Sequence, residues 1–280
     1  MRVPQKSFRK SVRSSYSNGI VSHRAKKSLG QNFLTDDNIA RKIVGSLSLS
    51  KEDFVVEIGP GKGALTKLIS KSNAKVEAIE KDNHLFGILQ EKFSVFPNIK
   101  LINADFLEWE FPVSRSLAKV VGNIPYNLTS SIVSKLVDER SKIDFAVLMV
   151  QDEVAKRLSA AVGTKDYGSI SIRLQLVADV NKLFPVSPNC FQPKPKVNSR
   201  IIKITFRKRE MLDNESEFVS FIKRAFGMRR KMFRHFVSHY YGKESINLLP
   251  DNFKTNRIES FTPEDIYHLF TILENNVQTY

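Results

Sequence analysis

The sequence predicts an α/β protein with a doubly wound, mostly parallel sheet and a small C-terminal helical domain. Three observations support this fold class. Short apolar runs alternate with helical patterns at the spacing of β-α-β units. Glycine, acid or amide residues follow these runs at their carboxyl ends, where such sheets bind ligands. The chain has 280 residues, and after about residue 207 its composition becomes charged and polar. The sequence that follows has helical patterns.

The apolar runs predict five strands, at residues 54–58, 75–80, 99–103, 119–122 and 145–150. Helical patterns lie between them at 64–70 and 83–93. An earlier helix is expected to run to about Leu47, with Thr35 as its N-cap and acids at 36 and 37 favouring its dipole.

Two helices are expected near the C-terminus. One runs from about Ser216 to Tyr241, and another opens at Thr262 with Pro263 at its first helical position. The chain therefore divides into a basic arm (1–27), a ligand-binding domain (28–207) and a helical domain (208–280).

Charge and cysteine usage narrow the function classes. Lys and Arg outnumber Asp and Glu by 44 to 29, a formal charge of +15, which favours a nucleic-acid partner over a merely basic soluble protein. The single cysteine, Cys190, excludes an internal disulfide. No apolar run reaches bilayer length. We expect a cytoplasmic monomer whose first 27 residues form an RNA-binding arm, with an organelle transit peptide as the alternative.

The loop Gly59–Ala64 fits the pattern G-x-G-x-x-G/A, which several nucleoside-cofactor folds share. Glu57 before the loop and Pro60, which lacks an N–H, disfavour a pyrophosphate. S-adenosylmethionine, a cationic nucleoside cofactor without phosphate, suits the loop better. Glu80 would accept from its ribose hydroxyls and Asp105 from its adenine amine. The alternative for each acid is a cap on the following helix.

The stretch Asn123-Ile124-Pro125-Tyr126 suggests chemistry on an exocyclic adenine amine. Its lone pair is delocalised into the ring, and two acceptors on the amine hydrogens would localise it toward a methyl donor. The Asn123 side-chain oxygen and the Ile124 or Pro125 carbonyl can serve, while Tyr126 stacks on the base. The alternative is a proline turn with a core tyrosine.

These motifs together resemble the ribosomal RNA adenine N6-dimethyltransferase family. The resemblance runs from about residue 26 to the end and rests on ordered motifs at 29–34, 56–61, 79–82, 123–126, 150–158, 167–171, 190–197 and 226–231.

The resemblance implies a Rossmann-like class I methyltransferase fold. It implies S-adenosylmethionine bound by Asn32, Leu34, Gly59, Gly61, Glu80, Asp105 and Asn123. It also implies catalysis by Asn123 and Pro125, with Tyr126 and Phe191 on either side of the target adenine. The expected substrate is a pair of adjacent adenosines in the 3′-terminal hairpin of small-subunit ribosomal RNA, in a pre-30S-like particle, with a role in subunit biogenesis.

Basic residues in the C-terminal third of the chain predict contacts with RNA phosphates. The alternative is that these side chains only form a solvent-exposed face without an RNA contact. The residues are Lys194, Lys196, Lys223, Arg224, Arg229, Arg230, Lys231 and Arg234. His235 and His239 have metal-binding spacing but no third ligand nearby, so no metal is expected.

Three alternatives stay open. They are a large-subunit rRNA adenine methyltransferase of the antibiotic-resistance type, a ribosome assembly factor without catalysis, and an NAD-dependent oxidoreductase.

Overall fold

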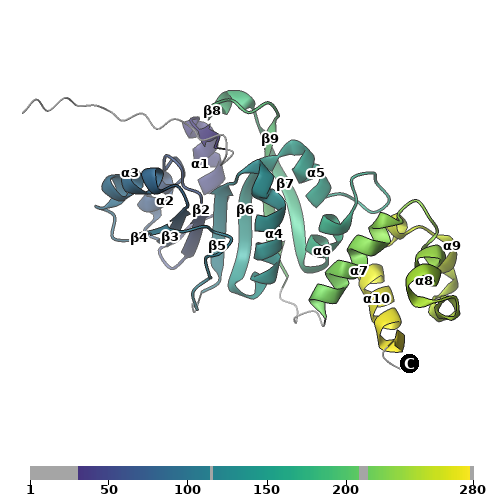
Figure 1. Ribbon diagram of the computed structural model, residues 1–280. Helices are drawn as coiled ribbons and strands as arrows, with labels where there is room; N and C mark the ends of the chain where they lie inside the picture. Colours follow the sequence, from purple (N-terminus) through teal and green to yellow (C-terminus); the bar gives the residue numbers. More distant parts are fainter. Residues whose placement is uncertain (1–30, 114–115, 208–213, 278–280) are drawn as a thin grey trace, which may run out of the picture.

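A seven-stranded sheet forms the centre of the protein (Figure 1). The computed structural model describes residues 31–113, 116–207 and 214–277. In sheet order the strands are β4 (Ile99–Asn103), β3 (Lys75–Glu80), β2 (Phe54–Ile58), β5 (Ala118–Asn123), β6 (Ile143–Gln151), β9 (Ser199–Phe206) and β7 (Ala178–Val186). The first five are parallel, and β9 is antiparallel to both of its neighbours. The predicted fold class is confirmed.

The strand order reverses between β2 and β5. From β2 the chain proceeds outward through β3 and β4, then returns to the other side of β2 and continues through β5 to β6. Loops that leave two adjacent strands in opposite directions open a crevice at the carboxyl edge of the sheet. Gly59 follows β2 and Asn123 ends β5, so both lie at this crevice.

Helices cover both faces of the sheet. On one face α1 (Asp37–Gly45) and α2 (Thr66–Ile69) share a buried cluster with β2, β3, β5 and β6. On the other face the cluster includes α4 (Thr129–Asp138), α5 (Asp152–Leu158) and α6 (Ser169–Val177). Helix α3 (Asn83–Phe93) connects β3 to β4. Short 3-10 turns lie at 70–72, 126–128, 140–142, 188–190, 244–248 and 258–260.

The lead segment (residues 31–36) is tied to a distant part of the chain. Its strand β1 (Phe33–Leu34) pairs with β8 (Phe191–Gln192). The predicted cap at Thr35 is wrong, because its amide and hydroxyl both donate to the carbonyl of Cys190. Asp36 caps α1 instead, accepting from the amides of Asn38 and Ile39 at 2.8 and 3.0 Å.

The C-terminal part comprises α7 (Glu215–Gly227), α8 (Phe233–Tyr241), α9 (Asp251–Thr255) and α10 (Pro263–Val277). The predicted single helix over 216–241 is wrong, since the chain turns between α7 and α8. The turn brings Phe221 and Phe236 together, with ring centroids 5.3 Å apart, in a cluster that a straight helix could not form. Thr262 does open α10 as predicted, through reciprocal bonds with Asp265.

One buried cluster continues from beneath α4–α6 into α7, α8 and α10. Tyr167, fully buried before α6, donates to the carbonyl of Phe261 at 3.0 Å and joins the two parts. The predicted boundary at 208 falls in residues 208–213, outside the described residues, as does the basic arm. Among the helices described, none is both long and apolar enough to cross a membrane.

Candidate active site

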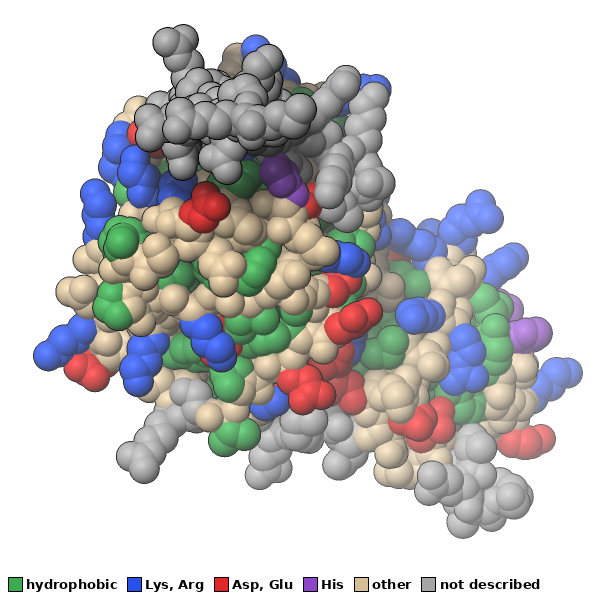
Figure 2. All heavy atoms as spheres, turned by 60° about the vertical axis from the view of Figure 1, so that its left-hand side comes forward, with side chains coloured by type: hydrophobic (Ala, Val, Ile, Leu, Met, Phe, Trp, Pro, Cys, Tyr) green, Lys and Arg blue, Asp and Glu red, His purple; other side chains and the backbone are tan. Residues whose placement is uncertain are grey.

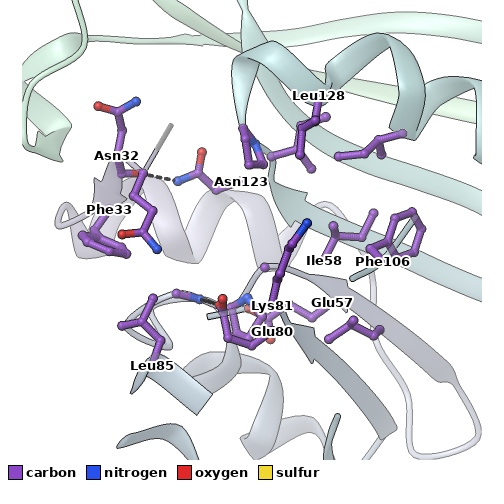
Figure 3. Close-up of a pocket in the computed structure, with 18 of the residues that line it drawn as sticks. Asn32, Phe33, Glu57, Ile58, Glu80, Lys81, Leu85, Phe106, Asn123 and Leu128 are labelled. Carbon is purple, nitrogen blue, oxygen red and sulfur yellow. Dashed lines mark hydrogen bonds between the residues drawn. The ribbon is translucent and has the colours of Figure 1, made fainter. Parts of the chain in front are cut away.

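A cavity of about 250 Å³ opens at the carboxyl edge of the sheet, where the strand order reverses (Figure 3). Five segments supply its walls: the lead segment, the glycine loop, the ends of β3 and β4, and the turn after β5. The structure brings to this one cavity the residues that the sequence assigned to the cofactor, namely Asn32, Leu34, Gly59, Gly61, Glu80, Asp105 and Asn123.

The backbone amides of the glycine loop donate to the end of β3 and within the loop itself. Gly59 and Gly61 have φ values of 61° and 60°, which glycine adopts without strain. The amide of Gly59 donates to Ile79 O at 2.9 Å, that of Gly61 to Glu80 at 3.0 Å, and that of Gly63 to Pro60 O at 2.8 Å. These amides are therefore engaged within the protein, and Pro60 has none to offer a phosphate. The loop fits a cofactor without phosphate.

Glu80 organises this end of the cavity. Its carboxylate is buried, and its two oxygens accept the amides of Gly61 and Asp82 at 3.0 and 2.8 Å. Two such bonds offset much of the cost of burying the charge. A carboxylate oxygen can accept more than one hydrogen bond, so the same group can also accept from the hydroxyls of a ribose.

Glu57 lies deeper, at the base of the cavity, and burial raises its pKa to about 7 against the opposing influence of Thr66. Its Oε2 has no hydrogen-bond partner among the described residues. A carboxyl group with this pKa is only partly charged at neutral pH. The engaged amides of the loop are therefore better evidence against a phosphate than Glu57 itself.

Asp105 lines the cavity just after the end of β4. Its Oδ1 accepts the amide of Leu107 at 2.9 Å, and its Oδ2 lies 2.5 Å from the ammonium of Lys81. Burial pushes the pKa of Asp105 upward, but Lys81 and the Leu107 amide outweigh it and hold the pKa below its ordinary value. The bond to Leu107 caps a turn at 106–108, whereas the alternative left open by the sequence was a cap on a following helix. Oδ2 is paired with Lys81, so a ligand that donates to this oxygen would share it with the lysine.

Sequence reasoning missed Lys81, which lines the cavity and extends into it (Figure 3). The signal was present, since Lys81 directly follows Glu80 at the end of β3. The strand-end rule that selected Glu80 also covers its neighbour.

The turn after β5 carries the proposed chemistry. The side-chain nitrogen of Asn123 donates to the carbonyl of Asn32 at 2.7 Å (Figure 3). The Pro125 carbonyl accepts from the amide of Leu128 at 3.0 Å and the hydroxyl of Thr129 at 3.4 Å. Of the two carbonyls considered from the sequence, that of Ile124 is therefore the better candidate for a substrate amine.

The two aromatic residues assigned to the target base lie in different environments. Tyr126 lines the cavity and is half-buried. Burial raises the pKa of its phenol, which lies 2.6 Å from the hydroxyl of Ser199. Phe191 does not line the cavity. It is 2% exposed, because its strand pairs with β1 and its ring packs into the core beneath. The structure thus does not show the expected pair of facing rings.

Seven of the eight predicted RNA-contacting side chains are exposed, and Figure 2 shows cations projecting from the C-terminal helical part. Arg229 differs. Its guanidinium donates twice to Glu259, at 2.9 and 2.8 Å, and once to the carbonyl of Lys165. Within the described ranges, no group of three His, Cys, Asp or Glu side chains could hold a metal, and His235 and His239 lie on the exposed surface.

Comparison with known proteins identifies the family of the chain. Residues 22–275 match the model of the family described as ribosomal RNA adenine dimethylase. The ribosomal RNA small subunit methyltransferase A of Prosthecochloris aestuarii is 42% identical over 248 residues, which cover 88% of this chain and 93% of that one. Its namesake from a Sulfurihydrogenibium species is 37% identical over 257 residues, 90% and 98% of the two chains.

Two solved structures share the fold along most of the chain. A dimethyladenosine transferase from Plasmodium falciparum has a TM-score of 0.79 at 26% identity, covering 88% of this chain and 98% of its own. The 23S rRNA methyltransferase ErmE has a TM-score of 0.67 at 28% identity, covering 87% and 100%. The predicted family, enzyme class and cofactor are confirmed, and the oxidoreductase alternative is wrong. The chain belongs to the ribosomal RNA adenine dimethylase family, whose members take their methyl groups from S-adenosylmethionine.

Proposed function

We propose that this protein dimethylates the N6 amino groups of two adjacent adenosines in the 3′-terminal hairpin of small-subunit ribosomal RNA. One observation carries the chemical part of the proposal. The Asn123 amide is oriented by Asn32, so that its oxygen is the free atom in the cavity at the reversal of strand order.

The geometry suits an amine that is a poor nucleophile. Asn123 Oδ1 accepts one hydrogen of the adenine amine and the Ile124 carbonyl accepts the other, which draws the nitrogen lone pair out of the ring. Tyr126 stacks on the base and holds the amine in line with the methyl donor. The adenine must leave its helical stack to enter, as in other enzymes that modify bases. No strong base is needed, because the methylated ammonium loses its proton readily.

The cofactor supplies the methyl group when it is bound. Glu80 is placed to accept from its ribose hydroxyls and Asp105 from its adenine amine. Apolar side chains such as Leu85 and Phe106 line the space between them. Asn32 and Leu34 close the cavity from the lead segment, while Gly59 and Gly61 allow close approach of the backbone.

The choice of small-subunit RNA rests on similarity. The curated relatives that are 37–42% identical are named small-subunit methyltransferases, whereas the large-subunit enzyme ErmE is 28% identical. Incubating isolated small and large subunits with labelled S-adenosylmethionine tests this choice. We expect N6,N6-dimethyladenosine in the small subunit. Label confined to the large subunit would show that the alternative is correct.

We also propose how the RNA is held. The exposed cations of 194–196 and of α7–α8 contact phosphates, and residues 208–280 act as the RNA-binding domain beside a catalytic domain of residues 28–207. In this proposal the protein acts as a cytoplasmic monomer on a pre-30S-like particle and has a part in subunit biogenesis. The intact acids and the Asn123–Tyr126 stretch support catalysis rather than a purely structural assembly role.

A further inference from the structure

A fully buried serine contacts the tyrosine of the active site. Ser199 opens β9 with 0% of its surface exposed, and its hydroxyl lies 2.6 Å from the phenol oxygen of Tyr126. The two residues are 73 positions apart in the chain. Strand β9 lies between β6 and β7, where Ser199 pairs with Gln151 and Val186. Its backbone is therefore fixed from both sides.

A hydroxyl at this position is costly unless it is hydrogen-bonded, because burial removes it from water. The Tyr126 phenol is the partner that the structure gives it. Since burial raises the pKa of that phenol, the phenol stays neutral at physiological pH and one of the two hydroxyls donates to the other. The bond therefore persists across the working pH range.

The turn that carries Tyr126 needs such an anchor. Regular strand pairing of β5 ends at Asn123, and Tyr126 begins a short 3-10 turn. A tyrosine side chain can adopt several χ1 rotamers, and a hydrogen bond at its phenol end selects one of them. Asn32 holds Asn123 at one end of the turn, and Ser199 holds the ring of Tyr126 at the other.

We propose that Ser199 is a positioning residue for methyl transfer, acting through Tyr126, which rests on the function proposed above. By holding the phenol oxygen it fixes the direction in which the ring extends into the cavity, and the preference of a phenol for hydrogen bonds near the ring plane favours one orientation of the face on which the target adenine stacks. Its neighbours strengthen the anchor. The carbonyl of Asn198 accepts the amide of Asp152 at 3.0 Å, and Arg200 is paired with the carboxylate of Asp152. The basic loop that includes Lys194 and Lys196 ends at Asn198, next to Ser199. The start of β9 therefore positions both the loop and the ring of Tyr126.

The test is a double-mutant cycle between Ser199→Ala and Tyr126→Phe. We measure kcat and KM on small subunits, the Kd of S-adenosylmethionine and the melting temperature. Each single variant keeps the aromatic ring but loses its anchor, so kcat should fall about tenfold. The Kd of the cofactor should change by less than about twofold, and the double variant should be no slower than either single one. Ser199→Cys retains a side chain of similar size with a weaker hydrogen-bond donor, so its kcat should lie between that of wild type and that of Ser199→Ala.

Ser171→Ala is the matched control. Ser171 is also 0% exposed, and its hydroxyl donates to the carbonyl of Arg157 at 2.6 Å, away from the cavity. It should lower the melting temperature to a similar extent while kcat stays within about twofold of wild type.

Wild-type kcat in Ser199→Ala, or losses that multiply in the double variant, would overturn the role of Ser199. If Ser199→Ala does not fold, Tyr126→Phe alone decides, because it removes the same bond from the cavity side. Failure of the proposed function is a separate result: wild-type protein would then leave small-subunit RNA unlabelled.

Discussion

The side-chain nitrogen of Asn123 donates a 2.7 Å hydrogen bond to the backbone carbonyl of Asn32, which lies 91 positions earlier in the chain. The reverse orientation of this amide would place two oxygens against each other, so the bond determines which atom faces the cavity. It also joins the turn that is proposed to carry catalysis to the lead segment, which lines the same cavity. A change at Asn123 should therefore affect both chemistry and cofactor binding, in proportions that depend on the new side chain.

Asn123→Ala should lower kcat by about a hundredfold or more, because it removes an acceptor aimed at the reacting amine. RNA affinity should stay within about threefold, since the exposed cations supply most of it. Asn123→Asp retains an oxygen acceptor but places a carboxylate against the carbonyl of Asn32. Compared with Asn123→Ala, Asn123→Asp should lower kcat less and should raise the KM for S-adenosylmethionine more. Methyl transfer and filter binding measure these effects, and near-normal turnover in Asn123→Ala would contradict the assigned role.

If the adenine amine of the cofactor donates to Asp105, as proposed above, Lys81 competes with it for that carboxylate. Its ammonium lies 2.5 Å from the oxygen that would accept the adenine amine, although the lysine side chain is 57% exposed. An ion pair this exposed to solvent contributes little to stability. Lys81→Met should therefore tighten S-adenosylmethionine binding by up to about fivefold at low salt, and the gain should shrink as salt rises.

Lys100→Met is the control for this prediction. Lys100 forms a similar ion pair, 2.7 Å from Glu77, and does not line the cavity. Its removal should leave cofactor affinity unchanged in calorimetric titrations. Weaker binding in Lys81→Met would mean that the lysine assists the cofactor rather than competing with it.

Much of the sheet was predictable because its five parallel strands are short runs rich in apolar residues. Residues 54–58, 75–80 and 99–103 were predicted with the bounds that the structure shows, and so was helix 83–93. Strands β7 and β9 were not predicted. In β7 the run 181–183 is exposed at the sheet edge and includes polar residues, so its pattern does not alternate as a half-buried strand should.

The errors have tertiary causes. Thr35 is a residue type that often caps helices, but its hydroxyl donates instead to the carbonyl of Cys190, 155 positions away. The segment 216–241 has helical spacing throughout, yet it turns so that Phe233 can pack against Phe221. At the site, strand ends were sufficient to group Glu80, Asp105 and Asn123. The partners that orient such residues, including Asn32 O and Ser199, come from distant segments that no local pattern connects.

The buried carboxyl of Glu57 should make stability depend on pH. Its folded pKa of about 7 is above its ordinary value of 4.5, so the folded state binds this proton more tightly than the unfolded state. The favourable contribution is fully present below about pH 4.5 and is lost as pH rises to about 7. The loss should amount to about 3 kcal/mol in the free energy of unfolding.

Glu57→Gln removes the titrating group. In urea unfolding of the cofactor-free protein between pH 5 and pH 8, its free energy of unfolding should fall less with pH than that of wild type. At pH 5, where Glu57 is protonated in wild type, the variant should have the lower free energy of unfolding. At pH 8 the difference in free energy of unfolding should shift in favour of the variant. Parallel curves for the two proteins would show that Glu57 does not titrate in this range.

Arg229 and Arg230 are adjacent in the chain, but their side chains have different environments in the structure. Arg229 is tied to Glu259 and to the carbonyl of Lys165, whereas Arg230 is exposed. Arg229→Ala should lower the melting temperature by a few degrees, because it releases the turn between α7 and α8 from its neighbours. Arg230→Ala should leave the melting temperature unchanged.

RNA binding should separate the same two variants. If Arg230 contacts a phosphate, Arg230→Ala should weaken RNA binding and reduce the slope of log Kd against log salt by about one. Glu259→Gln should reproduce the destabilisation of Arg229→Ala, and the double variant should add little to either. An Arg229→Ala protein with wild-type stability and a reduced salt slope would instead assign Arg229 to the RNA, as the sequence alone had predicted.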